Sequence, residues 1–148
     1  MADLLTRQLT MMMFDGVRLA VPLSAAMTIE RSVHIQPGVV EGQALGTITA
    51  RNQSYPVYAF SRRLELLPAL PAQRAFCVCL EDDSQAQRLA IACDSVTPLR
   101  LDSATVIQPL PTCMQYTGTP LRGFCSLAQQ LLLVSTADAL AAYIHSKE

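Results

Sequence analysis

Short apolar stretches separated by turn residues run along the whole chain. Residues 45–51 alternate between apolar and polar positions, whereas residues 76–80 are apolar throughout, with Cys77 and Cys79 between larger side chains. Alternation predicts a strand with one buried face, and a short continuous apolar run is typical of a strand buried on both faces. Several such strands, with turn signals at intervals of roughly 8–12 residues, indicate a barrel or a sandwich. The chain is therefore predicted to be mainly all-β.

Two helices accompany the predicted strands. Ser61 is a suitable N-cap for a short helix over residues 61–67, which Pro68 would end. The stronger prediction is a C-terminal helix over residues 136–145, with Thr136 as its N-cap. The apolar stripe of this helix consists of Leu140, Tyr143 and Ile144.

One strand is predicted to lie at a sheet edge. Residues 52–54 form a turn in which Asn52 tolerates a left-handed backbone, and the chain returns as a strand over residues 55–60. Pro56 has no amide hydrogen, so this strand lies at an edge or pairs from one side only. Such an edge could support a weak homodimer by strand pairing.

A faint internal repeat organises the chain. The matching stretches are residues 18–21 with 88–91, residues 26–29 with 96–99, and residues 46–57 with 123–134. The first two pairs share an offset of 70 residues and the third has an offset of 77, a difference that one loop insertion explains. We therefore expect a single domain over residues 1–148, built from two β-rich modules at about 14–67 and 74–145 that share one core.

Composition narrows the range of partners. The 148 residues are 51% apolar and only 16% charged, with a net charge of −1, so no basic surface is available for nucleic acid. The longest uncharged stretch, between Asp102 and Arg122, contains three prolines, and direct membrane insertion is not expected. Asp3 argues against a signal peptide, and five cysteines, an odd number, suit a reducing compartment. We expect a cytoplasmic protein with protein partners.

The sequence offers few residues for catalysis. Its two histidines, His34 and His145, have no nucleophile motif beside them, and no glycine-rich phosphate loop is present. Cys77 and Cys79 point to one face of a strand, where buried cysteines act as small apolar side chains. We expect no cofactor, no metal and no enzymatic activity. The alternative is a small thiol-dependent enzyme that uses Cys77, Cys79 or Cys93.

Three stretches of the chain form a series with a characteristic order and spacing: residues 46–60, residues 89–96 followed by 107–111, and residues 121–134. This series resembles the CheW-like coupling proteins of bacterial chemotaxis. The family's best-known motif is a glycine, an Asn-Leu-Arg-Gly turn and a strand with a central proline. Gly46, Arg51 and Pro56 fit this motif, whereas four residues depart from it: Thr49, Ala50, Asn52 and Ala59. Asn52 in place of glycine is a mild change, because Asn is the next-best residue at positive φ.

The resemblance implies two intertwined five-stranded SH3-like β-barrels with a C-terminal helix. It also implies a monomeric scaffold that links the cytoplasmic tips of chemoreceptors to the regulatory domain of a chemotaxis-type histidine kinase. The diverged motif leans toward a non-flagellar pathway such as type IV pilus twitching motility. The alternative is a twin-barrel module that binds another protein or peptide outside chemotaxis. By resemblance, the residues expected at the protein interface are Ala26, Thr28, Arg51, Asn52, Cys93 and Asp94.

Asp94 also has a structural interpretation, in which its carboxylate accepts a hydrogen bond from a loop amide. Arg51 likewise could do no more than solvate its turn or form a weak surface ion pair. Ile48 and Val57 are expected in the core.

Overall fold

The computed structural model describes residues 8–38, 42–82, 87–102, 105–115 and 119–147, which contain eleven strands and one α-helix. In chain order these are β1 (Gln8–Phe14), β2 (Val17–Pro22), β3 (Ala26–Arg31), β4 (Thr47–Ala50), β5 (Gln53–Tyr58), β6 (Phe76–Glu81), β7 (Arg88–Cys93), β8 (Ser95–Arg100), β9 (Gln108–Pro109), β10 (Gly123–Leu127), β11 (Gln130–Val134) and α1 (Ala137–Ser146). Single 3-10 turns, η2 (Leu23–Ala25), η3 (Ser32–His34) and η4 (Thr112–Met114), lie between strands. The all-β prediction with a C-terminal helix is confirmed.

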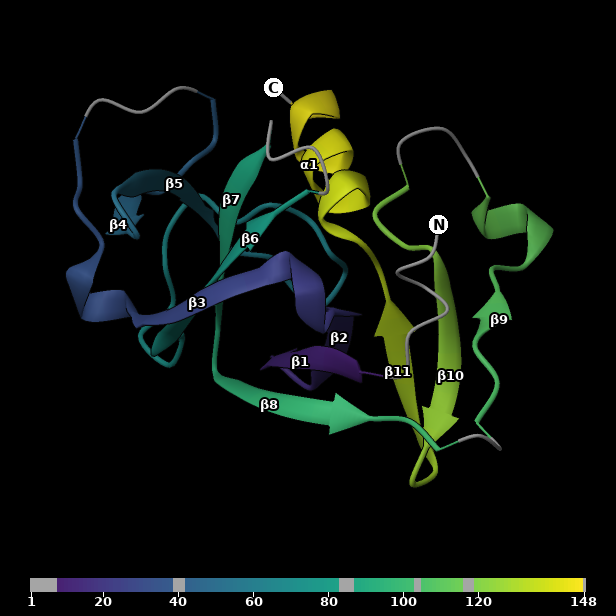
Figure 1. Cartoon of the computed structure of the whole chain (residues 1–148). Coiled ribbons are helices and arrows are strands. Elements are labelled where there is room, and N and C mark those ends of the chain that lie inside the picture. The colour runs from purple at the N-terminus through teal and green to yellow at the C-terminus, as the bar shows by residue number, and fades with distance from the viewer. Residues whose placement is uncertain (1–7, 39–41, 83–86, 103–104, 116–118, 148) are drawn as a thin grey trace.

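The strands form two sheets, and each sheet takes strands from both halves of the chain. One has the order β8-β1-β2-β11-β10-β9 and the other has the order β3-β6-β7-β5-β4. Strand β3 of the first half therefore pairs with β6, while β8 of the second half pairs with β1 (Figure 1). This exchange makes the two sheets intertwined. The first sheet has a sixth strand beyond the expected five, the two-residue β9, and its counterpart in the other sheet is the single bridge between Gln36 and Thr47.

The apolar runs are continuous because the central strands have two buried faces. In β7, Ala90 and Ala92 pack in a core cluster formed by strands of their own sheet. Leu89 and Ile91, on the other face of β7, belong to a second core that both sheets and α1 share. The side chains of β1 are distributed between two cores in the same way, and Met11 packs in the cluster formed by its own sheet, the six-stranded one. Met12 and Phe14 of β1 lie in the shared core. Ile48 and Val57 are buried as expected.

The internal repeat extends to details of the backbone. A Cβ atom at Gly46 would lie 2.8 Å from the carbonyl oxygen of Gln36, and one at Gly123 would lie 2.7 Å from that of Gln108. Both glycines are therefore required by close approach of a neighbouring chain segment. The two glycines are 77 residues apart and the two glutamines that approach them are 72 apart, so the contact recurs in both halves with a slightly different spacing.

The two β-hairpin turns that follow these glycines also match. Arg51 and Asn52, between β4 and β5, have φ of 53° and 62°. Ala128 and Gln129, between β10 and β11, have φ of 50° and 64°. Left-handed backbone at both central residues is the geometry of the tight turns that join twisted strands. The turn predicted at residues 52–54 thus lies one residue earlier, and Gln53 already belongs to β5.

The strand after this turn is not an edge strand. β5 lies between β4, with which it is antiparallel, and β7, with which it is parallel through Val57 and Tyr58. Pro56 is tolerated because the register with β7 begins only after it. The prediction of an edge over residues 55–60 is therefore wrong, and β5 has no free edge for the strand pairing expected there. The outer strands of this sheet are β3 and β4.

The short helix predicted over residues 61–67 is also absent. The Ser61 hydroxyl accepts hydrogen bonds from the amides of Arg63 and Glu65, so this residue caps a turn rather than a helix. Leu64 has φ of 62°, and Phe60 and Leu66 form a β-bridge across the turn. By contrast, α1 begins as predicted, because Thr136 accepts a hydrogen bond from the amide of Ala139 at 3.1 Å.

A buried arginine holds the centre of the molecule. Arg74 lies in the segment between β5 and β6 and is 1% exposed. Its guanidinium contacts Asp15 at 3.0 Å, in the turn between β1 and β2, and Asp94 at 3.3 Å, between β7 and β8. It also donates to the carbonyls of Phe60 and Ala92 at 2.8 and 3.4 Å. One side chain therefore ties the hairpins of both halves together.

Candidate partner-binding surface

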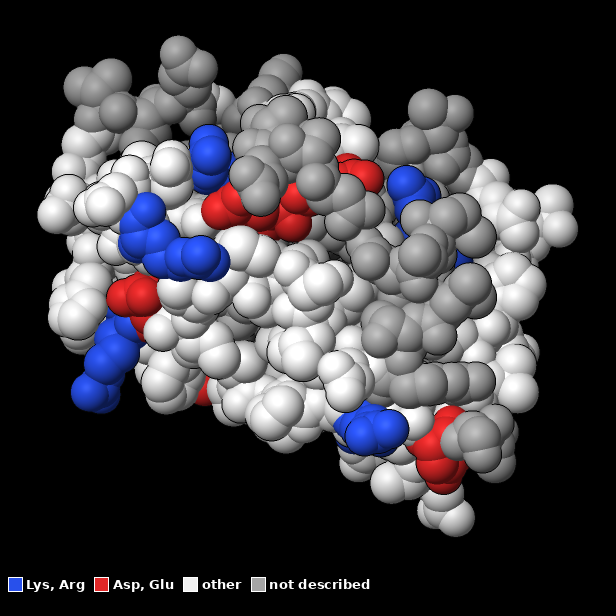
Figure 2. All heavy atoms as spheres, viewed as in Figure 1, with Lys and Arg blue, Asp and Glu red and all other residues white. Residues whose placement is uncertain are grey.

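A face with few charged side chains at its centre is formed by β3, η2 and β8, and we call it the β3–β8 face; its charged residues, Glu30, Arg31 and Arg100, are at the ends of the two strands. β3 and β8 are outer strands of different sheets and both face the viewer in Figure 1. Figure 2 shows that few charged side chains occupy the middle of this view. Two large apolar side chains on the face, Leu23 and Ile29, are 45% and 52% exposed. An exposed apolar surface of this kind is a common feature of protein interfaces.

The turn that carries Arg51 lies beside β3. Arg51 Nη1 is 3.4 Å from the sulfur of Met27, so the side chain extends from the β4–β5 turn across to the strand that contains Ala26 and Thr28. Asn52 is exposed at the same turn. The structure thus brings four of the six sequence-predicted interface residues into one region.

Only some side chains of β3 are available to a partner. Thr28 is aligned with Cys79 of β6, and its hydroxyl is buried against the Cys79 thiol. Ala26 packs on the shared core. A β-bulge between Ala26 and Thr28 leaves Met27 beside Arg51 and turns Ile29 to solvent. Sequence reasoning missed Ile29, which is exposed, and Met27, which is half-buried like Ala26 and Thr28 but contacts Arg51.

Cys93 and Asp94 make internal contacts. Cys93 is fully buried in the shared core, where burial raises its pKa to about 12, so its side chain offers no surface to a partner. Asp94 accepts a hydrogen bond from the amide of Asp15 at 3.3 Å and forms the ion pair with Arg74. The loop-amide interpretation of Asp94 is confirmed. The recorded contacts of both residues are thus with the core and with the β1–β2 turn.

A shallow pocket lies at one end of the β3–β8 face. It has a volume of about 270 Å³ and is bordered by Leu23 of η2, Leu9 of β1, and Pro98 and Leu99 of β8. Because residues of η2 and of β8 line the same pocket, these two elements form a continuous surface. Gln8 and Arg100 complete the lining, so a partner side chain that entered the pocket would contact these four apolar residues and two polar ones.

Nucleophilic chemistry does not suit the three buried thiols that the sequence offered for catalysis, Cys77, Cys79 and Cys93. Burial raises the pKa of Cys77, and it raises the pKa of Cys79 to about 11 and that of Cys93 to about 12. A thiolate is the nucleophilic form, and reactive cysteines have a lowered pKa. The structure therefore gives no support to the thiol-dependent enzyme. His34 and His145 are exposed, and the described residues contain no group of three His, Cys, Asp or Glu side chains that could hold a metal.

Comparison with known proteins identifies the family. The sequence model of the CheW-like domain matches residues 8–144. The chain belongs to the CheW-like domain family. CheW proteins are scaffolds and adaptors and are generally not enzymes, so membership indicates a coupling scaffold. No curated protein matches the sequence.

The fold agrees with this assignment. Among solved structures, the crystal structure of the scaffolding protein TtCheW from Thermoanaerobacter tengcongensis is similar, with a TM-score of 0.68 and 11% identity over 88% of each chain. The resemblance seen in the sequence is therefore confirmed, and the fold is CheW-like. None of the helices in the described part of the chain is long and apolar enough to span a membrane.

Proposed function

We propose that this CheW-like protein is a cytoplasmic scaffold that couples chemoreceptors to a chemotaxis-type histidine kinase. The observation that carries the proposal is the match to the CheW-like domain over residues 8–144, together with a β3–β8 face on that fold that has few charged side chains at its centre. The proposed partners are the cytoplasmic tip of a receptor and the regulatory domain of the kinase. The chain acts as a monomer within a larger array, where many weak contacts add through multivalency.

In this proposal the receptor tip lies along the β3–β8 face. Ile29 and Leu23 supply apolar contact area, and the pocket beside Leu23 accepts a side chain of the receptor. Arg51 supplies the polar anchor at one end of the face. Interfaces of transient signalling complexes bury modest areas and depend on a few such anchors.

The backbone of Arg51 supports a functional role for its side chain. Its φ of 53° is a conformation that costs a residue with a Cβ atom about 1 kcal/mol or more compared with glycine. Strained residues that persist often serve function. The contact with Met27 is too weak to account for the arginine, since sulfur is a poor acceptor.

The test is the binding of purified protein to the kinase regulatory domain and to a receptor-tip fragment from the same organism, by isothermal titration calorimetry. The variants are Arg51→Ala, Asn52→Asp and Ile29→Ser, with Arg63→Ala as the control, because Arg63 is another exposed turn arginine. We expect micromolar binding by the wild type. Arg51→Ala and Ile29→Ser should weaken binding to the receptor at least about fivefold, whereas the control should not.

The outcomes separate the two candidate functions. Selective loss of receptor binding would assign the face to the receptor, and selective loss of kinase binding would assign it to the kinase. Absence of binding to both fragments would reject the coupling function and favour a twin-barrel module for a partner outside chemotaxis. The departures of Ala50 and Asn52 from the family motif favour a non-flagellar output such as type IV pilus motility, which kinase and receptor fragments from each pathway would distinguish.

A further inference from the structure

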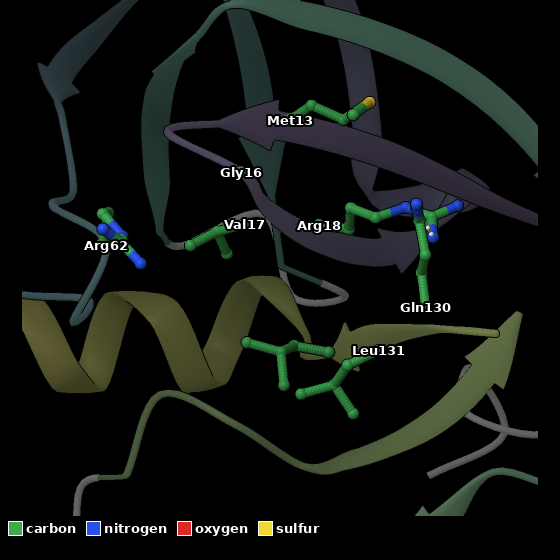
Figure 3. Close-up of a pocket in the computed structure, with 8 residues that line it drawn as sticks. Met13, Gly16, Val17, Arg18, Arg62, Gln130 and Leu131 are labelled. Carbon is green, nitrogen blue, oxygen red and sulfur yellow. Dashed lines mark hydrogen bonds between the residues drawn. The ribbon is translucent and has the colours of Figure 1, made fainter.

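A second concave surface lies at the tip of the β1–β2 hairpin, on different residues from the β3–β8 face. This pocket, which we call the hairpin pocket, has a volume of about 590 Å³. Figure 3 shows Arg18 and Gln130 at one end, Arg62 at the other, and Val17 and Leu131 between them. The apolar lining residues are Met13, Val17, Leu131 and Leu133.

Arg18 is held in place, but its described partners are neutral. Its Nη1 donates to Oε1 of Gln130 at 2.5 Å (Figure 3). The same atom donates to the carbonyl oxygen of Leu127 at 3.4 Å. Among the residues that the structure describes, no carboxylate lies within ion-pair distance of Arg18. The pocket lining contains two arginines and no acidic residue. Its electrostatic character is therefore positive.

The internal repeat provides a reference for this arginine. Arg18 of β2 corresponds to Arg88 of β7 at the offset of 70 residues. In the register of the hairpins, Arg18 is opposite Met13, and Arg88 is opposite Glu81.

The two copies therefore differ in the residue opposite the arginine, which is Met13 in the first and Glu81 in the second. Arg88 Nε lies 3.8 Å from Oε2 of Glu81, which also accepts a hydrogen bond from the Tyr55 hydroxyl at 2.6 Å. In the hairpin pocket, apolar Met13 occupies the position of that carboxylate. The first copy thus has the arginine of the pair, but apolar Met13 takes the place of the acidic residue.

The walls of the hairpin pocket are fixed in advance. The turn residue Asp15 is held by Arg74 at 3.0 Å, next to Gly16 at the rim. Arg18 itself fastens the β10–β11 turn through Leu127 and Gln130. Leu131 remains 59% exposed although it adjoins Val17 and Leu133 in the lining. A preformed site loses less entropy when it binds a ligand.

We propose that the hairpin pocket binds an acidic, apolar peptide segment of another protein. A carboxylate of the segment pairs with Arg18, in the place that Glu81 takes beside Arg88. A second carboxylate reaches Arg62, and an apolar side chain between them covers Val17 and Leu131. The site does not use the β3–β8 face, so a scaffold bound there can hold this third partner at the same time.

The test is selection from a random dodecapeptide library displayed on phage, panned on the wild-type protein. Binders are then counter-screened on the Arg62→Gln/Leu131→Ser double variant, whose altered side chains are exposed and so leave the fold intact. We expect enriched peptides with Asp or Glu on both sides of a Leu, Ile or aromatic residue. Synthetic versions should lose at least tenfold in affinity on the double variant. Arg63→Gln is the matched control and should change affinity less than twofold.

A further variant tests the comparison between the copies. Met13→Glu recreates the Glu81 arrangement beside Arg18 and should abolish binding of the acidic peptides, whereas Met13→Gln should weaken it only slightly. Thermal unfolding midpoints of all variants confirm that they are folded. The proposal is overturned if selection yields no acidic peptides, if the peptides bind the double variant equally well, or if Met13→Glu leaves binding unchanged. Loss of binding with Ile29→Ser would likewise overturn it, by assigning the peptides to the β3–β8 face.

Discussion

Replacing Arg74 is expected to be the most damaging single polar substitution in the described part of the chain. The Arg74→Met variant keeps most of the side-chain volume and removes the charge and every donor. The guanidinium lies 5.0 Å from the centre of the Phe14 ring, donates to two backbone carbonyls and pairs with two carboxylates. All of these contacts connect segments that are distant in sequence.

The magnitude follows from the separate contacts. The carbonyls of Phe60 and Ala92 each lose a donor, at about 1 kcal/mol or more per buried group. Contact of the cation with Phe14 contributes about 0.5–2 kcal/mol. Asp15 and Asp94 lose their partner, but their side chains are 31% and 33% exposed, so water partly replaces it. The sum is about 3–5 kcal/mol, the usual cost of breaking a buried ion pair by removing one partner.

Urea unfolding followed by far-UV circular dichroism measures this loss. For a chain of this length, a loss of 3–5 kcal/mol corresponds to a fall in the melting temperature of about 10 °C. Arg74→Lys should be intermediate, because it keeps the charge and loses the planar fork. A double-mutant cycle with Asp94→Asn should show coupling above about 1 kcal/mol. A loss below about 1 kcal/mol for Arg74→Met, or no coupling with Asp94, would refute the role assigned to this arginine.

Three further predictions concern turns, thiols and alkaline pH. Arg51→Gly should raise the free energy of unfolding by about 0.5–1 kcal/mol, because glycine relieves the left-handed strain. The same variant should still weaken binding to the partner of the β3–β8 face. Unchanged binding in calorimetry would show that the Arg51 side chain is not used. In the native protein, a thiol reagent should modify exposed Cys113 rapidly and leave the buried cysteines unmodified until denaturant is added, and Cys113→Ser should remove the fast phase. The pKa of Tyr55 is raised from 10.0 to about 12 by burial and by its hydrogen bond to Glu81, so the folded state holds the phenol proton that the unfolded state has lost. The free energy of unfolding should therefore fall between pH 10 and about 12. The buried thiols should add to this loss from about pH 9. In a series of urea titrations at different pH, Tyr55→Phe should reduce the dependence of the unfolding free energy on pH above pH 10.

Local sequence periodicity was sufficient to predict the strands and α1. Residues 76–80 form a strand with two buried faces, and Thr136 caps the helix, because side-chain alternation and capping depend on neighbouring residues alone. The repeat was readable for the same reason, since each copy needs a glycine where Gln36 or Gln108 approaches.

The failure over residues 61–67 has a tertiary cause. The sequence there is compatible with a helical turn, but Tyr143 of α1 donates a hydrogen bond to the carbonyl of Leu64 at 2.7 Å, and Phe60 bridges to Leu66. These contacts fix Leu64 in a left-handed conformation. Weak local preference is overridden when packing supplies such partners.

What the sequence determined by itself was the all-β class, the duplication and the family resemblance; it also led to the prediction of an interface around Arg51. Only the tertiary structure decided which side chains of that region face solvent, because the bulge at Met27 shifts the register of β3 and buries the Thr28 hydroxyl. It also decided that Arg74 is central and that Met13 stands where its counterpart Glu81 provides a carboxylate. Local patterns fix which elements form, whereas exposure and charge pairing depend on residues far apart in the chain that only folding brings together.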